Sequence, residues 1–191
     1  MSGNLDKRRK RTRIMVFCAI VCALSFILSM IGTISGVFDL ASVFFSGLLV
    51  GLLFLELGAR YALMVWAVTS ALLLLFLPDK LVAMEYLLFA GIYPVIKVLL
   101  EGLSDKKAWK FLCYLPKLIY FNLILTGLIL LATSVRLFMT PDNDLTMEWI
   151  VYVIGNAFFL LCDICYSVYI TAYKTKLRSR LKLAAWLGND R

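Results

Sequence analysis

Two long apolar runs separated by only three residues constrain this chain most. The runs cover residues 40–57 and 61–77, and Gly58-Ala59-Arg60 lies between them. Each run has about the 17–25 residues that a helix needs to cross a bilayer. Lipid offers no partner for backbone N–H and C=O groups, so a spanning segment of this kind is helical. The sequence therefore predicts a helical hairpin that crosses a membrane and returns.

Composition extends this interpretation to the whole chain. Of 191 residues, 62% are hydrophobic and 17% are charged, and the mean hydropathy is +0.90. Soluble domains are only about half apolar. We predict an all-α, polytopic membrane protein, a bundle of about six transmembrane helices. The expected spans are residues 14–34, 40–57, 61–77, 81–100, 118–138 and 148–172. They form one domain, 14–172, between basic tails at 1–13 and 173–191.

The distribution of lysine and arginine predicts the orientation of the bundle. Seventeen of the twenty basic residues fall on one side of the predicted membrane, six of them in each tail. Lys80 and Arg136 fall on the other side, and Lys97 lies within a span. Cytoplasmic segments carry the excess of positive charge, so both termini are expected in the cytoplasm of a cell with this protein in its cell membrane. The net charge of +8 then reflects orientation and contact with anionic lipid, not nucleic acid.

Several kinds of chemistry are excluded. The chain has no histidine, so Ser-His-Asp and Cys-His nucleophiles and histidine-ligated metal sites cannot form. It has no Gly-rich phosphate loop and no metal-ligand motif. The five cysteines are Cys18, Cys22, Cys113, Cys162 and Cys165. Their odd number and their predicted positions argue against a disulfide framework. We expect no enzyme and no cofactor.

Three residues next to the apolar runs are expected to shape helix ends. Asp39 precedes the run 40–57 and is expected to cap that helix, and Asp79 is expected to cap the helix that follows Pro78. Pro94 lies inside the fourth predicted span and should kink it.

Polar side chains in the outer half of the bundle form the predicted ligand site. Ionisable groups inside a membrane are costly and are functional candidates for that reason. Glu85 lies about one turn into the fourth span, and Arg136 lies near the outer end of the fifth, so we expect a similar depth for both. The same outer half contains Tyr86, Trp149, Tyr152 and Asn156. This set suits a small polar or zwitterionic ligand. The alternative is a Glu85–Arg136 ion pair that locks two helices, with the aromatic residues forming an interfacial belt.

Asp163 lies deeper, in the inner half of the last span. Asn156 precedes it by two turns, and Asn122 of the fifth span has a comparable depth. A structural contact between Asp163 and an asparagine is one interpretation, and a proton-coupling role is the other. Lys97 and Glu101 are spaced for a pair within one helix, to which we assign no chemistry.

The first span carries a stripe of small residues that indicates close helix packing. Cys18, Cys22, Ser25, Ser29 and Gly32 recur at spacings of three or four, with Ala19 and Ala23 beside them. Small residues let two helices approach closely in lipid. The helix that packs there belongs either to this chain or to a partner protein.

Two sequence segments resemble a known family. They are Ala19-Ile20-Val21-Cys22-Ala23 and the layout Ser46-Gly47-Leu48-Leu49-Val50-Gly51 followed by Gly58-Ala59-Arg60-Tyr61-Ala62. With the chain length and six spans, they resemble the substrate-binding S components of energy-coupling factor (ECF) transporters for vitamins and micronutrients. The resemblance implies a bundle that captures a small molecule from outside, with its ligand site in the outer half. It also implies that Ala19 and Ala23 face a transmembrane coupling subunit, which engages ATPases.

Two other functions remain open from the sequence. One is a membrane assembly or scaffold protein that transports nothing and uses its charges for packing. The other is a small proton-linked transporter, which would require Asp163 to gain and lose a proton.

Overall fold

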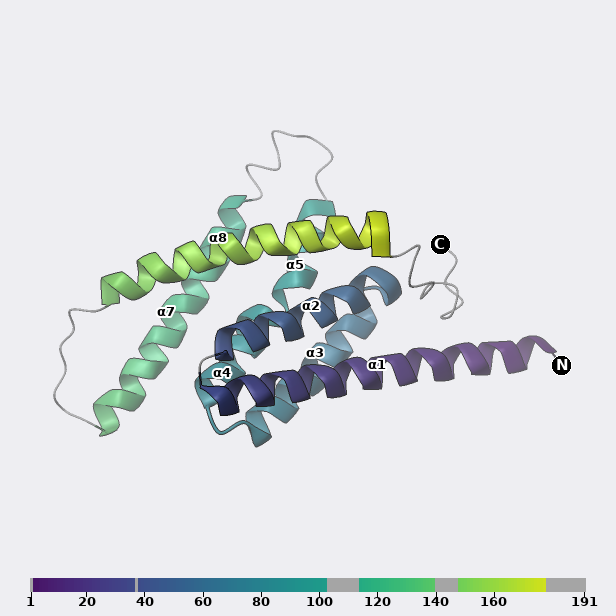
Figure 1. Ribbon diagram of the computed structural model, residues 1–191, viewed down its shortest axis with the longest axis horizontal. Helices are drawn as coiled ribbons and strands as arrows, with labels where there is room; N and C mark the ends of the chain where they lie inside the picture. The colour runs from purple at the N-terminus through teal and green to yellow at the C-terminus, as the bar shows by residue number, and fades with distance from the viewer. Residues whose placement is uncertain (1, 37, 103–113, 140–147, 178–191) are drawn as a thin grey trace. The chain divides into compact units, whose positions relative to one another are not determined.

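The structure, a computed structural model, describes residues 2–36, 38–102, 114–139 and 148–177, and in these ranges it is helical without strands (Figure 1). Six helical stretches are long and apolar enough to cross a membrane. They are Lys7–Ser35, Asp39–Leu57, Ala59–Phe76, Lys80–Leu100, Tyr114–Leu131 and Ile150–Lys176. The helical, six-span part of the prediction is therefore confirmed, as expected for a multi-pass membrane protein.

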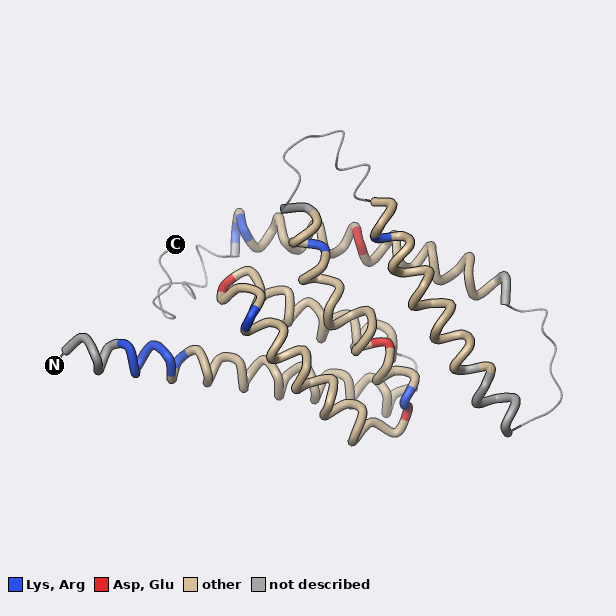
Figure 2. The backbone as a smooth tube through the Cα atoms, turned by 180° about the vertical axis from the view of Figure 1, so that it is seen from behind, with Lys and Arg blue, Asp and Glu red and all other residues tan. Residues whose placement is uncertain are grey.

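The first three spans are single helices, α1 (Ser2–Ser35), α2 (Asp39–Leu57) and α3 (Ala59–Phe76). The fourth span consists of α4 (Lys80–Glu85), the π-helix η1 (Tyr86–Ala90) and α5 (Tyr93–Gly102). The last two are α7 (Tyr114–Met139) and α8 (Glu148–Ala172), which ends in the π-helix η3 (Tyr173–Leu177). Because α1 begins at Ser2, the basic run that was predicted to be a tail is part of a helix (Figure 2).

The chain divides into two compact units. The first unit contains residues up to 95 and those from 167 onward, and the second contains residues 96–166. The second unit therefore holds most of α5, all of α7 and α8 as far as Tyr166.

Small residues pack α1 against α2 in the first unit. Ser46 Oγ donates to the backbone oxygen of Ser25 at 3.0 Å, and the Oγ atoms of Ser29 and Ser46 lie 2.9 Å apart. Since Ser46 gives its only proton to Ser25, Ser29 is the donor in the second bond. A Cβ atom added to Gly32 would lie 1.9 Å from Ser42 Oγ, so only glycine fits there. These contacts account for Ser25, Ser29 and Gly32 of the stripe within this chain.

The hairpin of α2 and α3 turns at one residue. Gly58 has φ of 90°, a conformation that glycine adopts without the strain imposed by a Cβ atom.

Two predictions about caps have opposite outcomes. Asp79 is the N-cap of α4, and its Oδ1 accepts a hydrogen bond from Leu81 N at 2.8 Å, as predicted. The prediction for Asp39 is wrong, because Phe38 is the N-cap of α2 and no side chain caps that end.

The fourth span is interrupted over residues 86–92, just before Pro94, which was predicted to kink it. The α-helical pattern stops after Glu85, continues as η1 to Ala90, and resumes at Tyr93 after a turn at Gly91. Pro94 is the second residue of α5. There its missing N–H has no cost, because the first N–H groups of a helix have no partner within the helix.

Candidate functional site

Two of the predicted ligand residues lie at the interruption of the fourth span. Glu85 is the last residue of α4 and is half-buried, and Tyr86 is the first residue of η1 and has an exposed fraction of 0%. The start of the π-helix therefore places a carboxylate and a phenol next to each other in sequence, inside a membrane-spanning segment.

Trp66 of α3 and Gly91 hold η1 in place. The indole Nε1 of Trp66 donates to the backbone oxygen of Leu87 at 3.1 Å. Gly91 N donates to the backbone oxygen of Tyr86 at 2.9 Å, which closes the wide turn. A Cβ atom at position 91 would lie 2.5 Å from Trp66 Cδ1 and 3.0 Å from the ring of Tyr86. The glycine thus allows both aromatic side chains to approach the backbone.

Polar side chains of α1 and α3 meet the same region. Thr69 Oγ1 donates to Cys22 Sγ at 3.3 Å, which joins the two helices. The phenol of Tyr86 lies near Thr69 and Cys22, and its hydroxyl has no hydrogen-bond partner among the described residues. Three elements thus bring hydroxyl and thiol groups into one region, and none of these side chains carries a charge.

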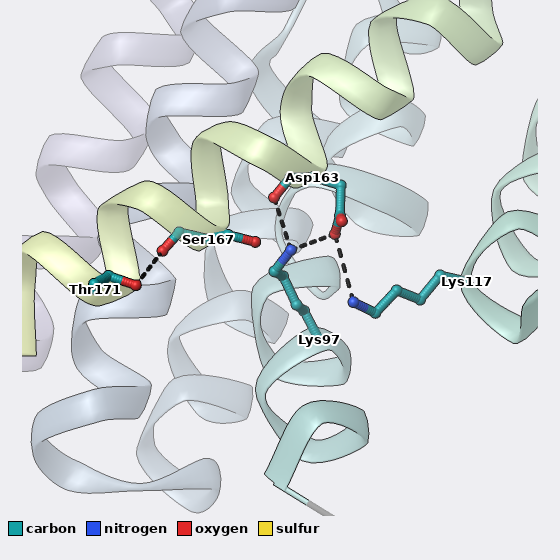
Figure 3. A network of polar contacts seen from close by, with 5 residues as sticks. All are labelled: Lys97, Lys117, Asp163, Ser167 and Thr171. Atoms are coloured by element: carbon teal, nitrogen blue, oxygen red, sulfur yellow. Dashed lines mark hydrogen bonds and ion pairs between the residues drawn. The ribbon is translucent and has the colours of Figure 1, made fainter. Parts of the chain in front are cut away.

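A cluster of three charged side chains lies in the second unit (Figure 3). Lys97 of α5 donates from Nζ to Asp163 Oδ1 and, at 2.7 Å, to the backbone oxygen of Asp163 in α8. Lys117 Nζ of α7 lies 3.6 Å from the same Oδ1 atom. Lys97 is 0% exposed, Lys117 4% and Asp163 9%. We call these three residues the ion cluster. Since buried charges are tolerated only when they are paired, the cluster ties α5, α7 and α8 together.

An amide pair joins α7 and α8 next to the ion cluster. Asn122 Nδ2 donates to Asn156 Oδ1, and Asn156 Nδ2 donates to Asn122 Oδ1, both at 3.0 Å. The second N–H of each amide goes to its own helix, to the backbone oxygens of Leu118 and Tyr152, at 2.9 Å each. Both donors of each amide are used, so the pair can offer a ligand only acceptor oxygens.

Further contacts continue the α7–α8 seam in both directions from the amide pair. Tyr152 OH donates to Thr126 Oγ1 at 3.0 Å, about one turn away from Asn156. Between the amide pair and the ion cluster, the rings of Phe121 and Phe159 stack with centroids 4.5 Å apart. Along the seam, two polar pairs are followed by one aromatic pair and then by the ion cluster.

The predicted ligand residues fall into separate groups. Glu85 and Tyr86 lie in the first unit, and Tyr152 and Asn156 lie together on α8 in the second. The side chains of Arg136 and Trp149 lie outside the described residues, as does that of Glu101. The Glu85–Arg136 pair therefore stays a prediction.

The predicted partner residues lie on the surface of α1. Ala19 and Ala23 are exposed, and so are Ile20 and Leu24 beside them. The opposite face of α1, with Ser25 and Ser29, is buried against α2. The face of α1 that carries Ala19 and Ala23 is therefore open to acyl chains or to a partner protein when the chain is in a membrane.

Sequence reasoning missed Lys97 and Lys117 as partners of Asp163. The interpretation placed Asp163 beside an asparagine and paired Lys97 with Glu101, whereas the structure joins Asp163 to two lysines and Asn122 to Asn156. A usable signal was present, because each lysine is an isolated cation next to apolar residues of its helix. Such cations need a carboxylate partner in lipid.

A further buried pair lies in the first unit. Tyr173 OH, at the start of η3, donates to Glu56 Oε1 at 2.7 Å, and both residues are buried. Glu56 is the residue before the last one of α2, so this bond attaches the end of the last span to the end of α2.

No set of three or more Cys, Asp and Glu side chains could hold a metal ion within the part of the chain that the structure describes. The described cysteines, Cys18, Cys22, Cys162 and Cys165, are free thiols. Comparisons of the chain with protein-family models, with curated proteins and with solved structures give no match in any of the three.

Proposed function

We propose that this chain is a multi-pass subunit of the cell membrane that binds a small polar solute and delivers it inward together with partner subunits. The observation that carries the proposal is the interruption of the fourth span at Glu85 and Tyr86. Backbone that departs from the α-helix at membrane depth is tolerated where protein buries it or where it lines a cavity. Transporters build their binding sites at such broken helices, and π-helical turns are frequent at functional sites.

The side chains at the interruption fit this role. Glu85 supplies a carboxylate that accepts hydrogen bonds from a solute, and Tyr86 supplies a hydroxyl that both donates and accepts. The polar groups of Cys22 and Thr69 lie next to Tyr86. The solute class we propose, a vitamin or micronutrient, comes from the resemblance to ECF S components.

The energy for uptake comes from other chains in this proposal. The sequence has no phosphate-binding loop, so a coupling subunit and its ATPases would supply the work of nucleotide hydrolysis. The exposed Ala19 and Ala23 support contact with such a subunit, since small residues allow a second helix to come close.

Solute recovery tests the binding part of the proposal. The protein is purified in detergent, small molecules are extracted from it, and mass spectrometry measures any that are bound. We expect Glu85→Gln and Tyr86→Phe to lower the recovered amount about tenfold, the effect of losing one good hydrogen bond. Tyr61→Phe is the matched control, because it removes a hydroxyl from an exposed tyrosine of α3. Equal recovery from all four proteins would contradict the proposal.

A separate experiment tests coupling. Replacing both Ala19 and Ala23 with Trp should stop uptake into cells while the purified chain still binds its solute. Ala67 and Ala71 have the same spacing on the exposed face of α3, so Ala67→Trp with Ala71→Trp is the matched control. Normal uptake by the Ala19/Ala23 variant would remove the coupling claim and leave solute binding in place.

The ion cluster favours a second candidate, a small proton-linked transporter. A carboxylate buried between two lysines inside the membrane is the kind of group that proton relays use. This candidate predicts that the purified chain alone, in liposomes with an imposed pH gradient, moves solute and that Asp163→Asn stops the movement. Transport that is unaffected by Asp163→Asn would exclude it. A scaffold protein would bind and move no solute in either experiment.

A further inference from the structure

Two buried serines in the first unit differ from their neighbours. Ser25 of α1 is 0% exposed and Ser70 of α3 is 2% exposed. Among the residues that the structure describes, neither Oγ atom has a hydrogen-bond partner. Ser29, one turn beyond Ser25 and equally buried, shares a hydrogen bond with Ser46. The helix stripe thus contains one satisfied serine and one unsatisfied serine at the same degree of burial.

An unsatisfied hydroxyl at this depth indicates a missing polar partner. Nearly all buried polar groups in native proteins are hydrogen-bonded to protein or to ordered water. Lipid cannot replace that partner. A buried hydroxyl without a hydrogen bond costs free energy. If the hydroxyl had no partner at all, alanine at the same position would avoid this cost. Ser25 and Ser70 therefore indicate that something polar occupies the space beside them.

The two serines lie close to the interrupted span. Ser25 is one turn from Cys22 on α1, and Ser70 follows Thr69 on α3. Since Cys22 and Thr69 are hydrogen-bonded to each other and α1 and α3 run in the same direction, the two serines lie at depths that differ by about half a turn. Tyr86 at the start of η1 lies near Cys22 and Thr69, and its buried hydroxyl also has no hydrogen-bond partner in the described part of the chain. Both serines are thus within one turn, along their own helices, of the residues that lie near Tyr86.

The chemistry of this region is uncharged. Serine, threonine, cysteine and tyrosine side chains meet there, whereas Glu85 interacts with Asp39 and Asp79 near the outer ends of α2 and α4. A charged group placed among these hydroxyls would lose its hydration and gain no counter-ion, which is strongly unfavourable. A hydroxyl or amide group would satisfy the serines without that cost.

We infer that Ser25 and Ser70, with Cys22, Thr69 and Tyr86, form a hydrated, uncharged site that takes the hydroxyl- or amide-bearing part of the solute. The inference rests on the proposed function and adds the chemical class of the buried part of the solute. Water occupies the site when solute is absent, which satisfies both hydroxyls in the empty protein.

Reaction of introduced cysteines with small methanethiosulfonate reagents tests the inference. The full-length protein is placed in liposomes after its five native cysteines have been replaced by serine. Ser25→Cys and Ser70→Cys then report on the site, Ser29→Cys is the matched buried control, and Ala23→Cys is the control for the exposed face of α1. The neutral 2-hydroxyethyl reagent is compared with the anionic 2-sulfonatoethyl and cationic 2-(trimethylammonio)ethyl reagents. These reagents need an ionised thiol, and therefore water, at the reacting sulfur.

We expect the neutral reagent to modify Ser25→Cys and Ser70→Cys about tenfold faster than Ser29→Cys and Ala23→Cys, a difference of about 1.4 kcal/mol in access. We also expect each charged reagent to react about tenfold more slowly than the neutral reagent at Ser25→Cys and Ser70→Cys. If the neutral reagent reacts no faster there than at Ser29→Cys, the serines lie in dry packing and the inference is wrong. If charged and neutral reagents react equally fast, the site is aqueous but not selective for neutral groups, which also overturns it.

Thermal unfolding of each cysteine variant checks that it folds. Should a cysteine variant fail to fold, Ser25→Ala and Ser70→Ala give the same decision through solute recovery. They should lower recovery about tenfold, and unchanged recovery would overturn the inference. The same experiments separate failure of this inference from failure of the proposed function. If Glu85→Gln and Tyr86→Phe reduce solute recovery while Ser25→Cys and Ser70→Cys stay unreactive, solute binding stands and only the assignment of this site is lost.

Discussion

At the residue scale, the buried polar side chains differ in whether their hydrogen bonds close within the chain. Ser29 donates to Ser46 between α1 and α2, and Ser46 donates to the backbone oxygen of Ser25. Asn122 and Asn156 satisfy each other between α7 and α8. Ser25 has no such partner in the described part of the chain. In lipid, a closed pair strengthens helix association, whereas an open hydroxyl weakens it unless water or a ligand completes the bond.

This difference predicts opposite effects for two alanine substitutions. Ser29→Ala should lower the free energy of unfolding by about 1 kcal/mol, because Ser46 loses its partner. Ser25→Ala should leave it unchanged within about 0.5 kcal/mol, because the hydroxyl makes no bond with the protein. Unfolding in mixed micelles, followed by circular dichroism, measures both. An equal loss in the two variants would show that Ser25 has a protein partner.

The ion cluster predicts a strongly non-additive pair of substitutions. Asp163→Asn should lower the free energy of unfolding by about 3–5 kcal/mol, because Lys97 stays buried after losing its carboxylate. Replacing both residues together, Lys97→Met with Asp163→Leu, should recover part of that loss, because Lys97 is then no longer a buried charge, whereas Lys117 still lacks the carboxylate. Thr171→Val, at an exposed position of the same helix, is the control. Additive losses in the double variant would mean that the pair does not stabilise the helices as a unit.

Sequence reasoning at this scale identified polar residues but not their partners. Asp163 was recognised as a buried carboxylate, yet its partner Lys97 lies 66 residues away. Hydropathy and charge give the depth of a residue in a span, but they do not show which neighbouring helix its side chain meets. That information depends on the rotation of each helix about its own axis, which packing determines.

At the element scale, η1 depends on one glycine. Gly91→Ala should lower the free energy of unfolding by about 1–3 kcal/mol, because its Cβ atom would overlap the Trp66 ring. The overlap is severe, since that atom would lie 2.5 Å from Trp66 Cδ1. Gly127→Ala is the matched control, because a Cβ atom there meets nothing within 4 Å and alanine favours a helix by about 1 kcal/mol. A Gly91→Ala variant as stable as the parent protein would contradict this account of η1.

Sequence analysis predicted regular helices better than their irregularities. The ends of α2 and α3 lie within two residues of the predicted ones, because glycine, proline and the ends of the apolar runs mark them. The π-helix was missed, since a wide turn has no composition that distinguishes it from an α-helix. The expectation that Asp39 caps α2 also failed, because a cap depends on local backbone geometry as well as residue type.

At the scale of the whole molecule, the number of spans predicts where each end lies. Both termini should be cytoplasmic, since an even number of crossings puts them on the same side and the excess of Lys and Arg predicts that this side is the cytoplasm. Alkaline phosphatase fused after Arg191 should be inactive, and fluorescent protein fused there should fluoresce. Phosphatase fused after Asp79, following three spans, is the positive control and should be active. Active phosphatase at the C-terminus would contradict the six-span arrangement.

The six spans were predictable because bilayer thickness fixes the length of an apolar helix. The division into two units was not predictable in the same way. It cuts within the helices α5 and α8, between residues 95 and 96 and between residues 166 and 167, where the sequence shows no change in composition. Tertiary contacts alone determine that boundary.

The mutual amide bonds of Asn122 and Asn156 limit how this chain can vary during evolution. Each side chain satisfies the other, so a mutation at one position leaves a polar group without its partner in lipid. Apolar replacements at both positions together avoid that penalty. Natural homologues should therefore carry asparagine at both positions or at neither, and the two alignment columns should covary.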